Sequence, residues 1–118
     1  MAAKSEKRNN KRYTIKFSTD LISKINYELI TSLVDMSVSG LAFRINPILV
    51  KLEKDQKISL HFNSAEENLD FAVDARVIWR KDDLVGVEFE DINAETTQSI
   101  KMLIEKYHKK IYSQKWER

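Results

Sequence analysis

The sequence predicts an all-β domain with a C-terminal helix, and two features of its pattern support this. Apolar and polar residues alternate with a period of two through most of residues 13–90, which is typical of strands with one buried face. After residue 91 the period changes to that of a helix. Turn-forming residues separate the alternating runs, so six strands in an antiparallel barrel or sandwich are expected.

The strand runs differ in how regularly they alternate. Four regular runs are Leu41–Ile45, Ile58–Asn63, Phe71–Trp79 and Val85–Glu90. Two earlier runs with weaker alternation, also interpreted as strands, are Tyr13–Phe17 and Tyr27–Val34. The segments between the runs are rich in Ser, Asn, Asp and Pro, which favour turns.

A single apolar stripe defines the predicted helix. It consists of Ile100, Leu103, Ile104, Tyr107 and Ile111. Asn93 or Asp91 can cap the start of this helix. The stripe is expected to pack on the sheet and cover one of its ends. Tyr112 and Trp116 extend the apolar surface, so the helix could also join two chains in a weak homodimer; a monomer is the alternative.

The chain accordingly divides into three parts. Residues 1–12 are polar and lack periodicity, which predicts a flexible basic arm. Residues 13–92 form the expected β-barrel, and residues 93–118 the helix and a basic tail. The arm carries a net charge of +4, residues 106–118 carry +4, and the rest carries −6. The basic ends could bind an anion, although solvated tails have the same composition.

Composition excludes several classes of protein. The 118 residues are enough for one domain with a single core. The sequence has no cysteine, so it cannot form disulfides, a thiol nucleophile or a thiolate metal site. No apolar run approaches the roughly 20 residues that span a bilayer, and the charged N-terminus lacks the apolar core of a signal peptide. A cytoplasmic location without membrane insertion is expected.

Most catalytic patterns are missing. His61 and His108 have no partner at the spacing of a metal site. Ser37 lacks the context of a nucleophile elbow, and no glycine-rich loop for a nucleotide triphosphate is present. We therefore expect no enzymatic activity, no metal and no cofactor.

Two short motifs remain as candidates for binding. Asp35-Met36-Ser37-Val38-Ser39-Gly40 lies between two strand runs and offers a carboxylate, a hydroxyl and a position without a side chain. The protein has only two glycines, and a glycine entering a strand marks a left-handed residue or a close backbone approach. Arg8-x-x-x-Arg12 precedes the first strand.

The order of these motifs resembles the PilZ domain family, from about Arg8 to the start of the last helix. The resemblance implies a six-stranded antiparallel β-barrel that binds the bacterial second messenger cyclic di-GMP and acts through a downstream protein effector. Its matching ligand-binding residues are Arg8, Arg12, Asp35, Ser37 and Gly40. The sequence differs from the family pattern in having few loop glycines and Lys7 before the first motif.

The chemistry of these residues fits such a ligand. Guanine presents N1–H and N2–H₂ donors, which a carboxylate such as Asp35 can accept. Arginine can hold phosphate or the guanine O6 and N7 acceptors. Two further candidates are Lys7, which could contact a second stacked ligand molecule, and Trp79. Trp79 is in phase with the core of its strand, so core packing is the first interpretation and stacking on a base the alternative.

Two other function classes stay open. The first is a PilZ-like protein-interaction module that binds no ligand, although both ligand motifs are kept here. The second is a small-barrel nucleic-acid binder, since small barrels with basic arms bind single strands. The acidic body and the few aromatic residues for stacking speak against it, so no nucleic-acid partner is expected.

Overall fold

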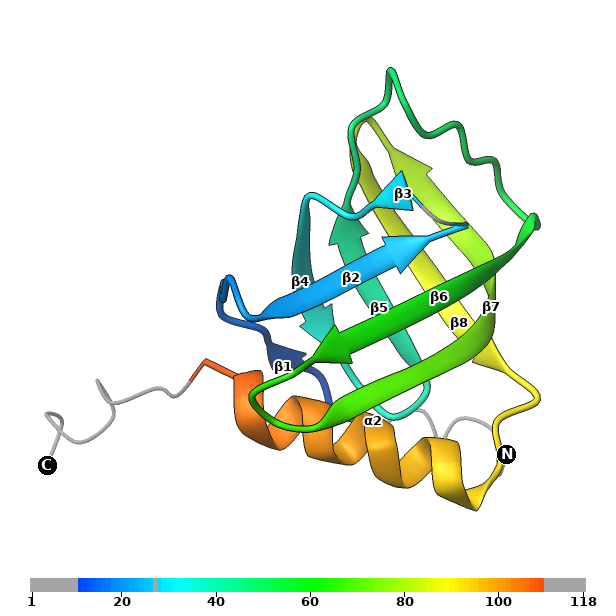
Figure 1. Cartoon of the computed structure of the whole chain (residues 1–118). Coiled ribbons are helices and arrows are strands. Elements are labelled where there is room, and N and C mark those ends of the chain that lie inside the picture. Colours follow the sequence, from blue (N-terminus) through cyan, green and yellow to red (C-terminus); the bar gives the residue numbers. More distant parts are fainter. Residues whose placement is uncertain (1–10, 27, 110–118) are drawn as a thin grey trace, which may run out of the picture.

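The computed structural model describes residues 11–26 and 28–109 (Figure 1). Within this part the chain is mostly β-sheet with one helix near its C-terminal end. The elements in order are β1 (Tyr13–Thr14), β2 (Leu21–Ile25), β3 (Glu28–Leu29), β4 (Ser32–Met36), β5 (Gly40–Arg44), β6 (Lys57–Ser64), β7 (Leu69–Lys81), β8 (Leu84–Glu90) and α2 (Ala94–Tyr107).

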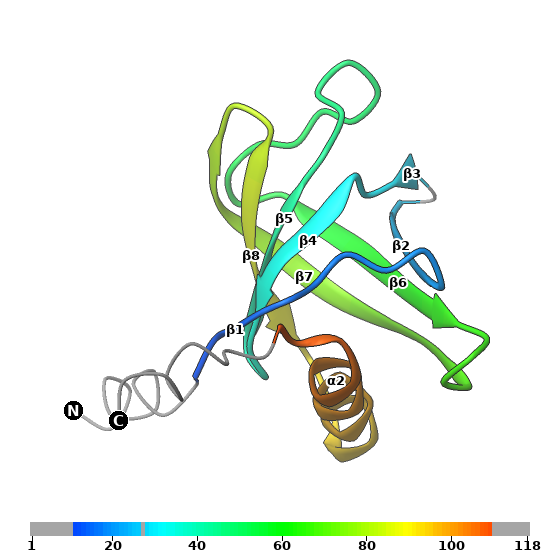
Figure 2. The same cartoon turned by 90° about the vertical axis from the view of Figure 1, so that its left-hand side faces the viewer.

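The strands form one antiparallel sheet that curves around the core. The strand order is β1-β4-β5-β8-β7-β6-β2-β3, so the ligand-motif strand β4 lies next to the edge strand β1. Figure 1 shows α2 lying across one end of this sheet. Figure 2 shows β1 beside β4, on the side where the last turn of α2 arrives. The strand β1 therefore lies close to both elements.

The expected six-stranded closed barrel needs correction. The described residues form eight strands, and the edge strands β1 and β3 do not pair with each other. The run Tyr27–Val34 is not one strand, because the Ile30 N–H donates to Ser23 while the Thr31 N–H donates to Arg44. The chain thus changes partner between β2 and β5 at these two residues, and one predicted strand becomes two.

The strand β2 is missing from the sequence prediction. Its inward positions are Leu21, Ser23 and Ile25, and the buried serine interrupts the apolar alternation that marks a strand. Its register against β6 is nevertheless continuous from Leu21 to Ile25. Burial against neighbouring strands outweighs the weak local pattern here.

The predicted helix stripe is confirmed for the described residues. Ile100, Leu103, Ile104 and Tyr107 of α2 are buried against the sheet. Asn93 is the N-cap, and its side chain accepts a 2.8 Å hydrogen bond from the Thr96 N–H. The helix ends at Tyr107. Ile111, Tyr112 and Trp116 lie outside the described residues, so their predicted roles are not tested. Within the described residues, α2 is too short and too polar to cross a membrane.

The core lies between the concave face of the sheet and α2. Side chains from most strands meet there, and the largest fully buried ones come from β2, β4, β5, β6, β7, β8 and α2. They include Phe43, Phe62, Ile25, Met36, Leu41, Leu60, Ile100 and Leu103. Since the inner face is filled, a ligand of nucleotide size can reach only the outer face of the sheet or its rims.

Candidate functional site

The structure brings the two binding motifs together through one ion pair. Thr14 of β1 lies directly opposite Asp35 of β4. Arg12 stands two residues before Thr14, and this pairing brings its side chain to Asp35. The Arg12 Nε donates to Asp35 Oδ1 at 2.8 Å, and Nη2 lies 2.7 Å from the same oxygen. Both side chains keep contact with solvent, at 47% and 31% exposure. The predicted candidates Arg8 and Lys7 lie outside the described residues.

This ion pair is poised for exchange with a ligand. Exposed pairs contribute only about 0–1 kcal/mol to stability, because water already solvates both charges well. A ligand that offers phosphate to the guanidinium or donors to the carboxylate could replace it at little cost. Arg12 and Asp35 thus form an exposed pair of opposite charges that a ligand could reach.

Ser37 has a structural position within the same motif. Its side chain is fully buried, and its Oγ accepts hydrogen bonds from the N–H groups of Ser39 and Gly40 at 3.1 and 3.2 Å. The Ser37 N–H in turn donates to the Gly40 carbonyl at 2.9 Å. These bonds shape the turn between β4 and β5, so the hydroxyl faces the turn and not the surface around Asp35.

Gly40 is required by its neighbouring strand. Its φ is not positive, so the left-handed alternative is wrong. A Cβ at this position would lie 2.5 Å from the carbonyl oxygen of Val87 in β8, far inside van der Waals contact. The close approach that the sequence indicates therefore exists, and the group that approaches is the protein's own backbone.

Trp79 lies on the outer face of the sheet, and the core-packing interpretation is wrong. The pairing of β7 with β8 shifts between Val77 and Trp79, so Val77 faces Val87 while Trp79 faces Gly86. One extra residue in a bulge reverses the alternation that follows it. Trp79 is 41% exposed, and its ring covers Gly86 so closely that a Cβ there would lie 2.2 Å from Cε2.

These residues share one line across the outer face. Paired residues of antiparallel strands point to the same side of a sheet. The register therefore defines an outer row of Thr14, Asp35, Ala42, Gly86 and Trp79, from β1 over β4, β5 and β8 to β7. Ala42 and Gly86, which lie between Asp35 and Trp79, are the smallest residues of the row. The row thus places the Asp35 carboxylate and the Trp79 indole three strand spacings apart, or about 14 Å.

The sequence signal for this row was Gly86. It interrupts the alternating run of β8 at an outward position, between the buried residues Val85 and Val87. Glycine at such a position indicates that another group approaches the backbone closely. The partner, Trp79, could not be identified from the sequence. The bulge that turns it outward does not interrupt the alternation of apolar residues along β7.

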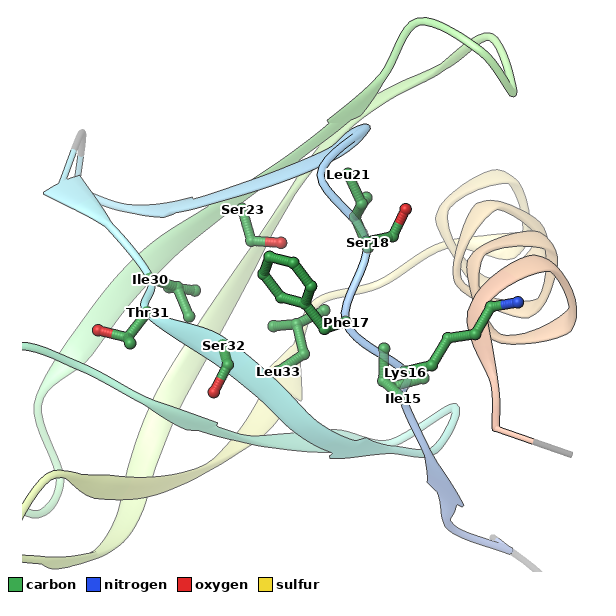
Figure 3. A pocket seen from close by; sticks show the side chains of 10 residues that line it. All are labelled: Ile15, Lys16, Phe17, Ser18, Leu21, Ser23, Ile30, Thr31, Ser32 and Leu33. Carbon is green, nitrogen blue, oxygen red and sulfur yellow. The ribbon is translucent and has the colours of Figure 1, made fainter. Parts of the chain in front are cut away.

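Two hollows elsewhere are weaker candidates. A cavity of about 50 Å³ lies between β2, β4 and the chain after β1, with Phe17 over its mouth (Figure 3). Ligand pockets typically measure about 300–1,000 Å³, so this cavity is too small for a dinucleotide. A larger open hollow of about 620 Å³ on the outer face of β2, β6 and β7 includes Lys24 and His61, but none of the predicted site residues.

Comparison with known proteins places this geometry in context. The model of the PilZ domain matches residues 6–106. The structure of the Legionella uncharacterized protein Lpg0364 is similar, with 14% identity, a TM-score of 0.57 and coverage of 81% of this chain and 91% of that one. The Bacillus subtilis inhibitor of motility (MotI/DgrA) is similar with 17% identity, a TM-score of 0.56 and coverage of 88% and 51%. No curated protein matches the sequence.

Proposed function

Because this chain belongs to the PilZ domain family, we propose that it is a bacterial receptor for cyclic di-GMP that changes conformation or partner when the ligand binds. The observation that carries the proposal is the ion pair between Arg12 and Asp35. It joins one residue from each of the two ligand motifs, on a solvent-exposed face.

The outer row supports a specific mode of binding. Asp35 accepts hydrogen bonds from the N1–H and N2–H₂ of one guanine, and Arg12 leaves Asp35 to hold a phosphate or the guanine O6 and N7. Arg8 contributes a second guanidinium from the arm. The small residue Ala42 lies between Asp35 and the indole of Trp79 in the row, and the exposed face of that indole, which covers Gly86, stacks on a base. Base–aromatic stacking contributes about 1–3 kcal/mol.

Calorimetric titration with cyclic di-GMP tests the proposal. We expect binding by the wild type and a strong loss in Arg8→Ala, Arg12→Ala and Asp35→Ala. The matched control is Arg44→Ala, since the ion pair between Arg44 and Asp83 has similar exposure, 46% and 43%, and a comparable Nη1–Oδ1 distance of 2.9 Å. Absence of wild-type binding, or equal binding by Arg12→Ala and wild type, would contradict the proposal. Equal binding of an arbitrary single-stranded oligonucleotide would favour a nucleic-acid binder.

A protein effector is part of the proposal. The loop between β5 and β6 presents Ile48 and Leu49 with 82% and 66% exposure. Neighbouring side chains of this size and exposure suit a contact with another protein. The same observation favours the second candidate function, a PilZ interaction module that needs no ligand. Pull-down of one effector with equal yield in the presence and absence of cyclic di-GMP would support that candidate.

A further inference from the structure

The strand β1 is held along both of its edges. On one edge it pairs with β4, and the Ile15 N–H donates to Val34 at 3.0 Å. On the other edge the Lys16 N–H donates to the carbonyl of Tyr107 at 2.8 Å, and the Lys109 N–H donates to Thr14 at 2.6 Å. The end of α2 therefore continues the sheet beside β1, and Figure 2 shows the two segments meeting there.

The position of β1 decides where Arg12 lies. A strand of two residues has little stability of its own. A shift of one residue in its register would turn every side chain of the strand to the opposite face. Arg12 reaches Asp35 only while Thr14 stays opposite Asp35. Whatever fixes β1 from the side of α2 thus also fixes the arginine.

Tyr107 contributes two of the contacts on this side, one through its carbonyl and one through its hydroxyl. Its side chain is 4% exposed, and its hydroxyl donates to Asp20 Oδ2 at 2.8 Å. Ser64 Oγ lies 2.6 Å from the same hydroxyl and donates to it, since the phenol has a single hydrogen. Asp20 belongs to the segment that follows β1, while the Tyr107 carbonyl holds Lys16. One residue thus binds the chain on both sides of Phe17.

We infer that Tyr107 is a positioning residue for ligand binding: it holds β1 from the side of α2, and β1 holds Arg12 beside Asp35. The residue lies on the opposite edge of β1 from the outer row, so it acts without touching the ligand. The inference rests on the proposed function, because its main effect is on the affinity for cyclic di-GMP. The converse also follows, since coupling between two sites is reciprocal: bound ligand should stabilise the end of α2.

The test is Tyr107→Phe, which keeps the ring and removes the hydrogen bonds to Asp20 and Ser64. We expect the affinity for cyclic di-GMP to fall about fivefold or more, the usual lower range for coupled sites. The control is Ile100→Val, a buried change on α2 that also costs stability but lies away from β1. It should leave the affinity unchanged. Wild-type affinity in Tyr107→Phe, or an equal loss in Ile100→Val, would overturn the inference.

A second measurement separates this inference from the proposed function. In the protein without ligand, the Arg12 Nε–H donates to Asp35, and this hydrogen bond should slow its exchange with water relative to an unbonded arginine. Nuclear magnetic resonance can follow this proton in wild type and in both variants. Tyr107→Phe should speed its exchange several-fold, and Ile100→Val should not. If cyclic di-GMP does not bind at all, the proposed function fails, and unchanged exchange in Tyr107→Phe would then still overturn the positioning role.

Discussion

The two glycines provide the sharpest test of the packing around the site. Gly40→Ala places a Cβ 2.5 Å from the Val87 carbonyl oxygen, whereas ordinary contact begins at 3.4 Å, so a gap of about 0.9 Å must open between β5 and β8. Backbone in a sheet ladder cannot move aside alone, and overpacking of this kind costs about 1–3 kcal/mol. Without the contact, alanine would stabilise by about 0.4–1 kcal/mol through the unfolded chain. A fall in the free energy of unfolding would therefore indicate the contact with Val87, and a rise would indicate its absence.

Gly86→Ala adds the same methyl group with a different expected outcome. Here the close atoms belong to the indole of Trp79, with Cε2 at 2.2 Å. This side chain is partly exposed and can rotate away, so the free energy of unfolding should change by about 1 kcal/mol or less. The indole would leave its place on β8, and with it the far end of the outer row.

Urea and thermal unfolding, both followed by circular dichroism, measure the two effects. Gly40→Ala should lower the melting temperature by about 4–12 °C, at about 4 °C for each kcal/mol in a domain of this size. Gly86→Ala should lower it less, yet change the emission of Trp79 when Trp116 is replaced by phenylalanine in all proteins compared. If Gly40→Ala is as stable as the wild type, or less affected than Gly86→Ala, the proposed contact with β8 is wrong.

Three further predictions concern the ligand and the end of α2. Asp35→Asn should bind cyclic di-GMP with an affinity between those of wild type and Asp35→Ala. Wild type should prefer cyclic di-GMP to cyclic di-AMP by more than about tenfold, or about 1.4 kcal/mol. Equal calorimetric affinities for the two dinucleotides would show that Asp35 does not recognise the base. If Lys7 contacts a second stacked ligand, saturation should require two ligand molecules per chain and Lys7→Ala only one; a wild-type ratio of one would refute this. Hydrogen bonds to Asp20, above all from Ser18 and to a lesser extent from Tyr107, lower its pKa. Burial is the main cause that raises the pKa of Tyr107, and the contact with Asp20 raises it further. Stability should therefore fall as the pH drops below about 4 and again as it rises above about 10, and urea unfolding of Tyr107→Phe should lack the alkaline loss.

The sequence predicts best where one physical requirement decides a residue. Strands with one buried face must alternate, so β6 and β8 follow from their own residues, as does the buried stripe of α2 with its Asn93 cap. The motif around Asp35 was singled out because it follows Arg8-x-x-x-Arg12 in the chain and lies between two strand runs; taken alone, its residue types only indicate a turn. The ion pair with Arg12 required more, since the two residues are 23 positions apart and only the register of β1 on β4 joins them.

What the sequence alone determined is the class of the protein: a mostly β domain with a C-terminal helix and two motifs that suit an anionic, donor-rich ligand. Tertiary structure decided which residues meet. The buried Ser23 hid β2, a bulge turned Trp79 outward, the turn buried Ser37, and the end of α2 took a place beside β1. Each of these depends on pairing between strands or on contacts far apart in the chain, and such contacts leave no period in the local sequence.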